Sequence, residues 1–487
     1  MFRYEKIDAT STIFLSPVEK VVEFTPRGAD NIAKVLSLSV DGKVLSSTPC
    51  NGYAEISARA DFTLIYLDYD GNPTSANYNA DFNLRLDGDI ADNDNLSISV
   101  KVIEWNVQTG DILTLSAVVK AYGLATKAMP LNILVDAKDS YITTSKVVVP
   151  TAIANTTYSF PVDDETTVGD VEKVLSLSTK CSLTHTKVRD KQVDLSVDTT
   201  AIITYIQDGQ IRTATFLVST DESVSVDDVL AGDKIYVVPQ VRSGKVVLAG
   251  VTGENILRFE GEITTSIQGT RYVEQEIADD LFMLTHNTTI TRENVSLTGF
   301  VGTGFFKERI YGEADLPDCD NGSLIGTPAI SAFVAKSIWD EDLNVEGVVT
   351  AEILYYADGA TRSARAEVPY SINLIGDFTD NILPRVSVLD TSVKIKNQKA
   401  EINVLLGFEI SSFANGNISY ISNVELGEER PVNTSGLSMY VANDGDTMWD
   451  VCKALTATPE QILSQNPTLT FPLKQCDKVL YFRQLKG

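Results

Sequence analysis

An internal repeat constrains the fold of this chain more than any other feature of its sequence. The hexapeptide Lys-Val-Leu-Ser-Leu-Ser occurs at residues 34–39 and again at residues 173–178. After each copy, a segment with apolar residues at alternate positions ends at an Asp-Gly pair, and a third such segment ends at Asp358-Gly359. This alternation predicts strands with one buried face, and Asp-Gly accepts the positive φ of a tight hairpin. We therefore expect three related β-rich domains.

Strand-like alternation continues through most of the chain, and helical periodicity is almost missing before residue 437. The predicted fold class is mainly β and multidomain, with three related antiparallel β-sandwich or barrel-like repeats before a small βααβ domain. One large β domain with chance similarity is the alternative. A polar segment with two glycines and a proline is expected to be a linker. The predicted boundaries are 1–129, 130–269 and 270–424 for the repeats, 425–437 for the linker and 438–487 for the last domain.

The charge balance narrows the range of partners. Lys and Arg number 40 against 66 Asp and Glu, which gives a formal net charge of −26. Such a field repels phosphate groups, so nucleic acid and anionic membranes are poor partners. No apolar run approaches the roughly 20 residues of a membrane span. The first residues lack the apolar region of a secretory signal, so we expect a cytoplasmic protein.

Residues that carry chemistry are few. The five cysteines are scattered and do not form a disulfide framework; for Cys452 and Cys476, two buried thiols are favoured over a disulfide. Neither His185 nor His286 has a nucleophile motif near it in the sequence, which argues against a catalytic triad. The acidic loop 318–322 departs from the spacing of a calcium-binding loop. We therefore expect no enzyme activity, no cofactor and no metal.

After residue 437 the pattern changes from period two to helical spacing. Thr447 and Asp450 have the spacing of a helix capping box. Thr458 and Gln461 form a second box, in which Pro459 occupies the first helical position, where its missing N–H costs nothing. Short apolar strands precede the first helix and follow the second. The order strand, helix, helix, strand predicts a small domain of its own, which we call the C-terminal module.

The C-terminal module resembles the LysM family over about residues 438–484. The resemblance rests on Gly445-Asp446-Thr447-Met448-Trp449-Asp450-Val451, followed by Leu463, Asn466-Pro467 and a closing hydrophobic strand. It implies binding of N-acetylglucosamine-containing glycans in a shallow groove between the loop after the first strand and the loop after the second helix. Trp449 lies off the apolar stripe of its helix, where it either anchors a partner or covers the edge of the module. The candidate ligand-binding residues are Asp444, Gly445, Asp446, Thr447, Trp449, Asn466, Pro467, Leu469 and Leu473.

One position departs from the LysM pattern. Cys476 stands in the turn before the last strand, where the family usually has glycine. A residue with a Cβ atom is disfavoured at positive φ. We therefore expect the edge of the groove to be reshaped.

The whole chain is similar to the SPOCS-domain proteins of the spore coat of endospore-forming Firmicutes, in which tandem β domains precede a LysM domain. Leu316-Pro317-Asp318 in the third repeat is similar to the Pro-Asp-Ile entry that is common there. The resemblance implies a coat morphogenetic protein that stays in the mother-cell cytoplasm and tethers coat layers to the forespore surface. It also implies that the module can bind a protein partner, the ATPase scaffold of the coat.

Three functions of different classes compete at this point. The first is a non-enzymatic scaffold or anchoring protein of spore coat assembly, whose module binds a coat scaffold protein or a glycan. The second is a cell-wall-associated protein that binds peptidoglycan, a polymer containing N-acetylglucosamine, and it requires export. The third is a glycan hydrolase, which needs a pair of acids in a cleft, and no repeat has a recognisable pair in its sequence.

Overall fold

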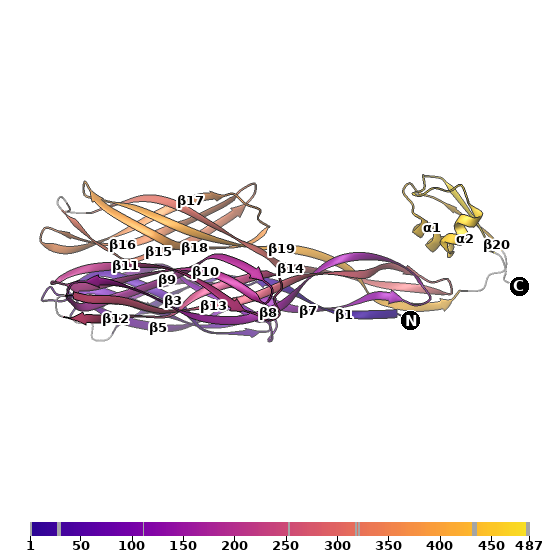
Figure 1. Cartoon of the computed structure of the whole chain (residues 1–487). Helices are drawn as coiled ribbons and strands as arrows, with labels where there is room; N and C mark the ends of the chain where they lie inside the picture. Colours follow the sequence, from indigo (N-terminus) through magenta and orange to yellow (C-terminus); the bar gives the residue numbers. More distant parts are fainter. Residues whose placement is uncertain are drawn as a thin grey trace.

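The computed structural model describes residues 2–26, 31–110, 112–251, 254–316, 319, 322–430 and 436–483. Over these ranges the chain is mainly β, as predicted, with antiparallel sheets and two short helices near the C-terminus. Figure 1 shows a bundle of sheets at one end, which we call the head, and long strands that run on from it as a narrower stalk. The N-terminus lies at the far end of the stalk, on the same side of the molecule as the C-terminal module.

The first unit of the head is a sandwich of two antiparallel sheets. One sheet pairs β7 with β1, β2 and β6, and the other has the order β3–β4–β5. Apolar side chains of both sheets, among them Phe62 and Leu115, meet in one core between them. The strands are β1 (Phe2–Phe14), β2 (Val18–Phe24), β3 (Lys34–Cys50), β4 (Tyr53–Leu67), β5 (Pro73–Asp87), β6 (Asn95–Gln108) and β7 (Thr114–Ala137).

The second and third units repeat this arrangement, except that one long strand, β8 or β14, takes the place of β1 and β2. Their paired sheets are β12–β13–β8 with β11–β10–β9, and β14–β19–β18 with β15–β16–β17. The second unit consists of β8 (Tyr141–Val168), β9 (Val171–Arg189), β10 (Gln192–Gln207), β11 (Gln210–Ser225), β12 (Lys234–Val251) and β13 (Glu254–Phe282). The third consists of β14 (His286–Asp315), β15 (Ser323–Trp339), β16 (Leu343–Ala357), β17 (Ala360–Leu374), β18 (Asn381–Lys396) and β19 (Lys399–Glu429).

The boundaries between the units lie further along the chain than predicted. β7 runs through the predicted boundary at residues 129–130, and β13 runs through the one at residues 269–270. β19 continues to Glu429, so residues 425–429 of the predicted linker are strand residues. These boundaries are wrong because the strands stay paired through Pro130, Gly269 and Glu425. Residues 431–435 of the linker, and Pro317-Asp318 of the third repeat, lie outside the described residues.

The stalk is formed by the ends of the longest strands. β1 pairs with β7, β8 with β13, and β14 with β19, and these three ribbons share a core of apolar residues that includes Leu131, Ile277 and Ile418. β13 has 29 residues. At about 3.3 Å per residue, such a strand spans roughly 95 Å. The head and the stalk are therefore continuous, with no break in the strands that join them.

The Asp-Gly pairs form hairpin turns as predicted. In the second unit Asp208 and Gly209 have φ of 50° and 69°, and in the third unit Asp358 and Gly359 have φ of 48° and 77°. Positive φ at both residues is the conformation of a type I′ turn, which matches the twist of the flanking strands. In the first unit the turn is longer, and Gly71 alone has a positive φ, of 83°.

The hexapeptide repeat lies where the three units meet. Its copies begin β3 and β9, and a β-bulge falls on the third residue of each copy, Leu36 and Leu175; a further bulge falls on Ile325 of β15. A bulge re-aims a side chain, and these three side chains pack in one cluster between the units. Leu38 and Leu177 of the same hexapeptides contribute to the cores of their own sandwiches. The repeated segment thus contributes to two cores at once, which accounts for its recurrence.

Buried polar groups also join the units. The indole Nε1 of Trp105, in the first unit, donates a hydrogen bond to Glu352 of the third unit at 3.2 Å. The guanidinium of Arg365 lies over the Trp105 ring, 4.9 Å from its centroid. Burial raises the pKa of Glu352 to about 7, although Arg365 and Trp105 favour the charged carboxylate.

We expect Glu352 to make the stability depend on pH. Its pKa is about 7 in the folded chain, against the ordinary value of 4.5 for a glutamate. Between these pH values the native state therefore retains a proton that the unfolded state releases. Stability therefore falls as the pH rises through this window, by about 3 kcal/mol. Urea unfolding at pH 5 and pH 7.5 measures the effect. The difference between the two pH values should shrink by about 2 to 3 kcal/mol in Glu352→Gln; an equal difference in both proteins would contradict the assignment.

Candidate functional site

The C-terminal module is built as a two-stranded sheet covered by two helices. It consists of β20 (Gly436–Val441), α1 (Met448–Leu455), α2 (Pro459–Gln465) and β21 (Lys478–Arg483). Both predicted capping boxes are present, Thr447 with Asp450 on α1 and Thr458 with Gln461 on α2. The helices bury apolar side chains against the inner face of the sheet. The core residues include Val451, Cys452, Ala457, Ile462, Val479 and Tyr481.

The two loops expected to form a groove lie side by side. The N–H of Gly445 donates to the carbonyl of Leu473 at 2.9 Å, and the N–H of Leu473 donates to the carbonyl of Asp446 at 2.8 Å. Gly445 has φ of 91°, a conformation that glycine adopts without strain. The side chain of Leu473 is buried in the core of the module, so it is not available to a ligand.

Several of the predicted ligand residues have their polar groups engaged within the module. The carboxylate of Asp446 accepts a hydrogen bond from the Tyr440 hydroxyl at 2.6 Å. Thr447 caps α1, and the amide of Asn466 is bonded to both backbone groups of Leu480. The exposed members of the set are Asp444, Gly445, Thr447 and Pro467, of which Thr447 has its hydroxyl engaged in the cap, and Leu469 is half-buried.

Trp449 contacts the stalk. Its indole Nε1 donates to the carboxylate of Asp280 at 3.0 Å, and its ring meets the edge of Phe282 with 5.1 Å between centroids. Lys453, one turn further along α1, forms an ion pair with the same carboxylate at 2.5 Å. Of the two readings of Trp449, anchor for an external partner or cover for an edge, the structure supports the second. Its off-stripe position on α1 faces the body of the protein.

Asp280 and Phe282, which the sequence did not single out, form the docking point for the module. Burial opposes ionisation of Asp280, but the hydrogen bonds from Lys453 and Trp449 prevail and lower its pKa. Arg430, just after β19, adds a second link by donating to the Thr456 hydroxyl at 2.5 Å. Nothing in the sequence pairs the end of β13 with α1, because the two are far apart along the chain.

The two cysteines of the module differ in exposure. Cys452 and Cys476 are both free, but only Cys452 is buried. The expectation of two buried thiols is therefore wrong for Cys476, because this residue lies on an exposed turn just before β21 and not in the core. Burial raises the pKa of the Cys452 thiol to about 11. Cys476 has φ of 72°, so the turn keeps the left-handed conformation that glycine favours.

Replacing Cys476 by glycine should stabilise the module. The substitution relieves a Cβ atom at positive φ, and part of this gain is offset by the greater freedom of glycine in the unfolded chain. We expect the free energy of opening of α1, from native-state hydrogen exchange, to rise by about 0.5 to 1 kcal/mol. Cys476→Ala keeps the Cβ atom and is the matched control, so equal stability of the two variants would contradict the argument.

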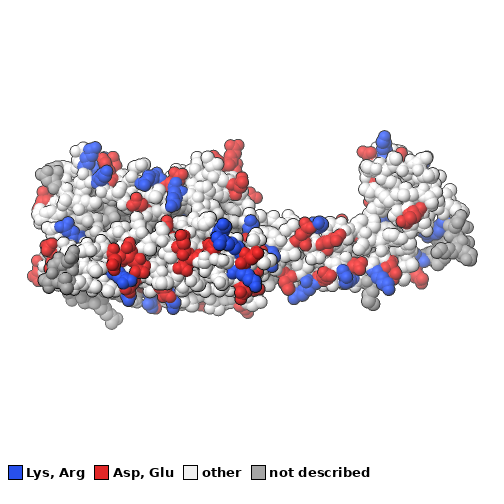
Figure 2. All heavy atoms as spheres, viewed as in Figure 1, with Lys and Arg blue, Asp and Glu red and all other residues white. Residues whose placement is uncertain are grey.

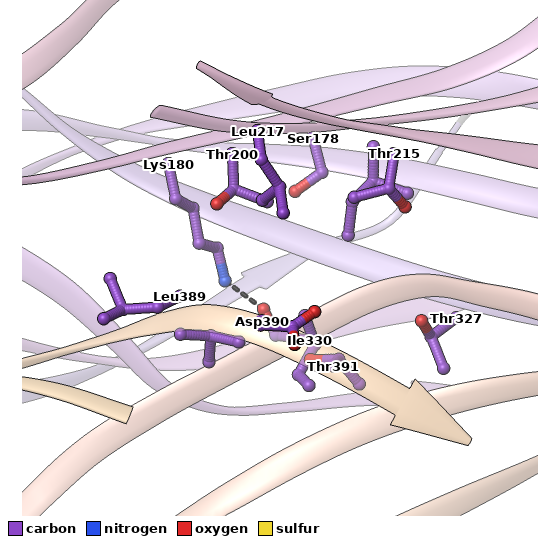
Figure 3. A pocket seen from close by; sticks show the side chains of 12 residues that line it. Ser178, Lys180, Thr200, Thr215, Leu217, Thr327, Ile330, Leu389, Asp390 and Thr391 are labelled. Atoms are coloured by element: carbon purple, nitrogen blue, oxygen red, sulfur yellow. Dashed lines mark hydrogen bonds between the residues drawn. The ribbon is translucent and has the colours of Figure 1, made fainter. Parts of the chain in front are cut away.

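A small cavity lies between the second and third units (Figure 3). Hydroxyl groups of Ser178, Thr200 and Thr391 line it, and the ammonium of Lys180 donates to the backbone carbonyl of Ile330 at its wall. Burial lowers the pKa of Lys180. The cavity has about 40 Å³ of accessible space, which suits a few water molecules and no larger ligand.

Metal ligands, membrane-spanning helices and surface charge are the other features to consider in the described residues. Among the residues that the structure describes, no three His, Cys, Asp or Glu side chains are grouped to hold a metal ion. Neither of the two helices in the described ranges has the length and apolar character needed to cross a bilayer. Figure 2 shows positive and negative side chains intermixed on the viewed face of the head and stalk, so the net charge is not gathered there into one patch.

Comparisons of the chain with protein-family models, with curated proteins and with solved structures found no match. Any inference about function therefore rests on the geometry of this chain. A small module, docked on the end of a stalk, presents two adjacent loops and a two-stranded sheet.

Proposed function

We propose that this protein is a non-enzymatic scaffold or anchoring protein, in which the C-terminal module attaches a partner and the head and stalk hold the module. The observation that supports this most is the docking of the module through Trp449 and Lys453 onto Asp280. The contact fixes a small domain at the end of a body whose longest strands span roughly 95 Å. A module held in this way is a defined attachment point.

The module is proposed to be a LysM-like domain. Three features support this assignment: the sequence from Gly445 to Val451, the element order β20, α1, α2 and β21, and the capping box at the start of each helix. The adjacent loops around Gly445 and Leu473 correspond to the sides of the groove that the family uses.

A protein is the favoured partner, and a glycan the second candidate. Recognition of a glycan relies on polar groups that are free to bond sugar hydroxyls. In this module Asp446, Thr447 and Asn466 already bond the module itself. The observation that supports glycan binding is the exposure of Asp444, Gly445 and Pro467.

The proposed setting is assembly of a spore coat. Three units with nearly the same strand order, followed by a LysM-like module, are similar in arrangement to the SPOCS-domain coat proteins. The proposed location is accordingly the mother-cell cytoplasm at the forespore surface, with the ATPase scaffold of the coat as the partner. The net charge of −26 disfavours nucleic acid in this role.

Two binding assays with the full chain test the proposal. The chain is sedimented with insoluble peptidoglycan and, separately, immobilised in a lysate of sporulating cells. We expect capture of one dominant coat protein and no retention by peptidoglycan above a control without ligand. Retention by peptidoglycan without a protein partner would favour the wall-associated alternative, and failure of both assays would overturn the proposed function.

A further inference from the structure

One face of the module's two-stranded sheet is apolar and exposed. Leu437, Met439 and Val441 of β20 and Leu480 and Phe482 of β21 are each between 46% and 68% exposed. The register places Leu437 opposite Phe482 and Met439 opposite Leu480, so these side chains form one patch. We call it the apolar sheet face. Contiguous exposed apolar residues of this kind mark an interaction site more often than an ordinary surface.

The β21 edge of this sheet is closed by side-chain amides. Asn466 accepts a hydrogen bond from the N–H of Leu480 at 3.0 Å and donates to its carbonyl at 2.7 Å. Gln465 accepts from the N–H of Phe482 at 2.6 Å and donates to its carbonyl at 3.0 Å. These two amides take the place that a neighbouring strand would occupy. No further strand can pair at β21 without displacing them.

The β20 edge is open. Residues of an antiparallel pair alternately direct their backbone groups toward the partner strand and away from it. The backbone groups of Leu480 and Phe482 point away from β20, because they bond the amides of Asn466 and Gln465. Met439 and Leu437 lie opposite these two residues, so their backbone groups point away from β21. No other described residue bonds these outward groups. On β20, the residues with unpaired backbone groups thus also contribute side chains to the apolar sheet face.

We propose that β20 is the docking edge for an extended segment of a partner protein, which adds to the sheet as a third strand. Outward N–H and carbonyl groups supply the backbone hydrogen bonds of such an addition, and the apolar sheet face receives alternate side chains of the segment. The inference rests on the proposed function, because it names the surface through which the module attaches its partner. The existing contacts of α1 with Asp280 remain in place, since they use another part of the module.

The charges define the segment further. Lys478 lies opposite Val441 in the register and is exposed, and it is the one charged residue among the outward-facing residues of the described strands β20 and β21. A segment with alternate apolar residues and a carboxylate placed against Lys478 therefore complements this face. The net charge of −26 disfavours a second copy of the chain and an anionic membrane as the occupant.

Selection of peptides tests the proposal without knowledge of the partner. A displayed library of random nine-residue peptides is selected on the immobilised full chain, and the affinity of an enriched peptide is then measured. We expect enriched sequences that alternate apolar residues and carry Asp or Glu. Met439→Pro removes an outward N–H, and Met439→Lys places a charge on the face; each should weaken binding by about tenfold or more. Leu463→Lys, at an equally apolar and exposed position on α2, is the matched control and should leave the affinity within about twofold.

Four outcomes would overturn the proposal, and the last of them separates it from the proposed function. The first is enrichment of peptides without alternation, and the second is unchanged affinity in both Met439 variants. The third is sedimentation of the full chain with phosphatidylcholine–phosphatidylglycerol vesicles that is lost in Met439→Lys, which would make the face a membrane contact. If the coat partner is captured equally well by Met439→Lys, strand addition fails while the proposed function stands; if the unaltered chain captures no partner, the proposed function itself fails.

Discussion

Replacing Arg385 by methionine is expected to lower the free energy of unfolding by about 3 to 5 kcal/mol at neutral pH. Arg385 and Glu409 are paired residues of β18 and β19, their ion pair is 3.0 Å long, and their side chains are only 11% and 6% exposed. Arg385 also donates to the Tyr236 hydroxyl of the second unit at 2.5 Å. Removing the guanidinium leaves a buried carboxylate without its cation, and burial already raises the pKa of Glu409.

A second substitution at the Arg385–Glu409 pair is the control for this prediction. Adding Glu409→Gln to Arg385→Met removes the unpaired charge, so the double variant should regain most of the lost stability. The loss in the single variant should also be smaller at pH 5 than at pH 8, because a protonated Glu409 needs no cation. Urea unfolding at both pH values measures these differences. A loss of less than about 1 kcal/mol in the single variant would show that the buried pair contributes little to stability.

Replacing Phe282 by alanine is expected to release the C-terminal module from the stalk. Phe282 is 2% exposed and lies between the ring of Tyr141, 5.2 Å away, and the ring of Trp449, 5.1 Å away. Truncating a buried aromatic side chain costs about 3 to 5 kcal/mol. Since Phe282 packs in the same apolar cluster as the core of the module, we expect the loss to appear as undocking of the module.

The three tryptophans of the chain make this measurable. In a ¹⁵N-tryptophan-labelled sample, the indole signal of Trp449 should shift and exchange faster with solvent in Phe282→Ala, because its bond to Asp280 is lost. Phe378→Ala makes the same change in the head, next to Phe306 and Trp339, and should leave the Trp449 signal in place. An unmoved Trp449 signal in Phe282→Ala would contradict the docked arrangement.

Local signals in the sequence predicted local structure well. The Asp-Gly pairs form the expected hairpins, and the residues Thr447 and Thr458 cap the expected helices. These features depend on φ preferences and on hydrogen bonds within a few residues, which neighbouring sequence largely determines. The hexapeptide repeat indicated that the units are related, but it did not explain why this segment recurs. The structure explains the recurrence: bulges at Leu36 and Leu175 direct these side chains into the cluster between the units.

Features that depend on contacts between distant segments were not predicted. The continuation of β7 and β13 past the expected boundaries depends on the shared core of the stalk, which no single strand reveals. The position of Trp449 depends on Asp280 and Phe282, more than 160 residues earlier in the chain. Likewise, the open edge of β20 is visible only once the amides of Gln465 and Asn466 are seen to close the other edge.

The central claim is that the C-terminal module attaches the partner and that the head does not. Site-specific photo-crosslinking in the cells that make the protein tests it most directly. A benzoylphenylalanine is introduced at Met439 in one strain and at Tyr69, which is 71% exposed on a turn of the head, in another. The account predicts one dominant crosslinked protein from position 439 and none from position 69. A product from position 69 alone would contradict it.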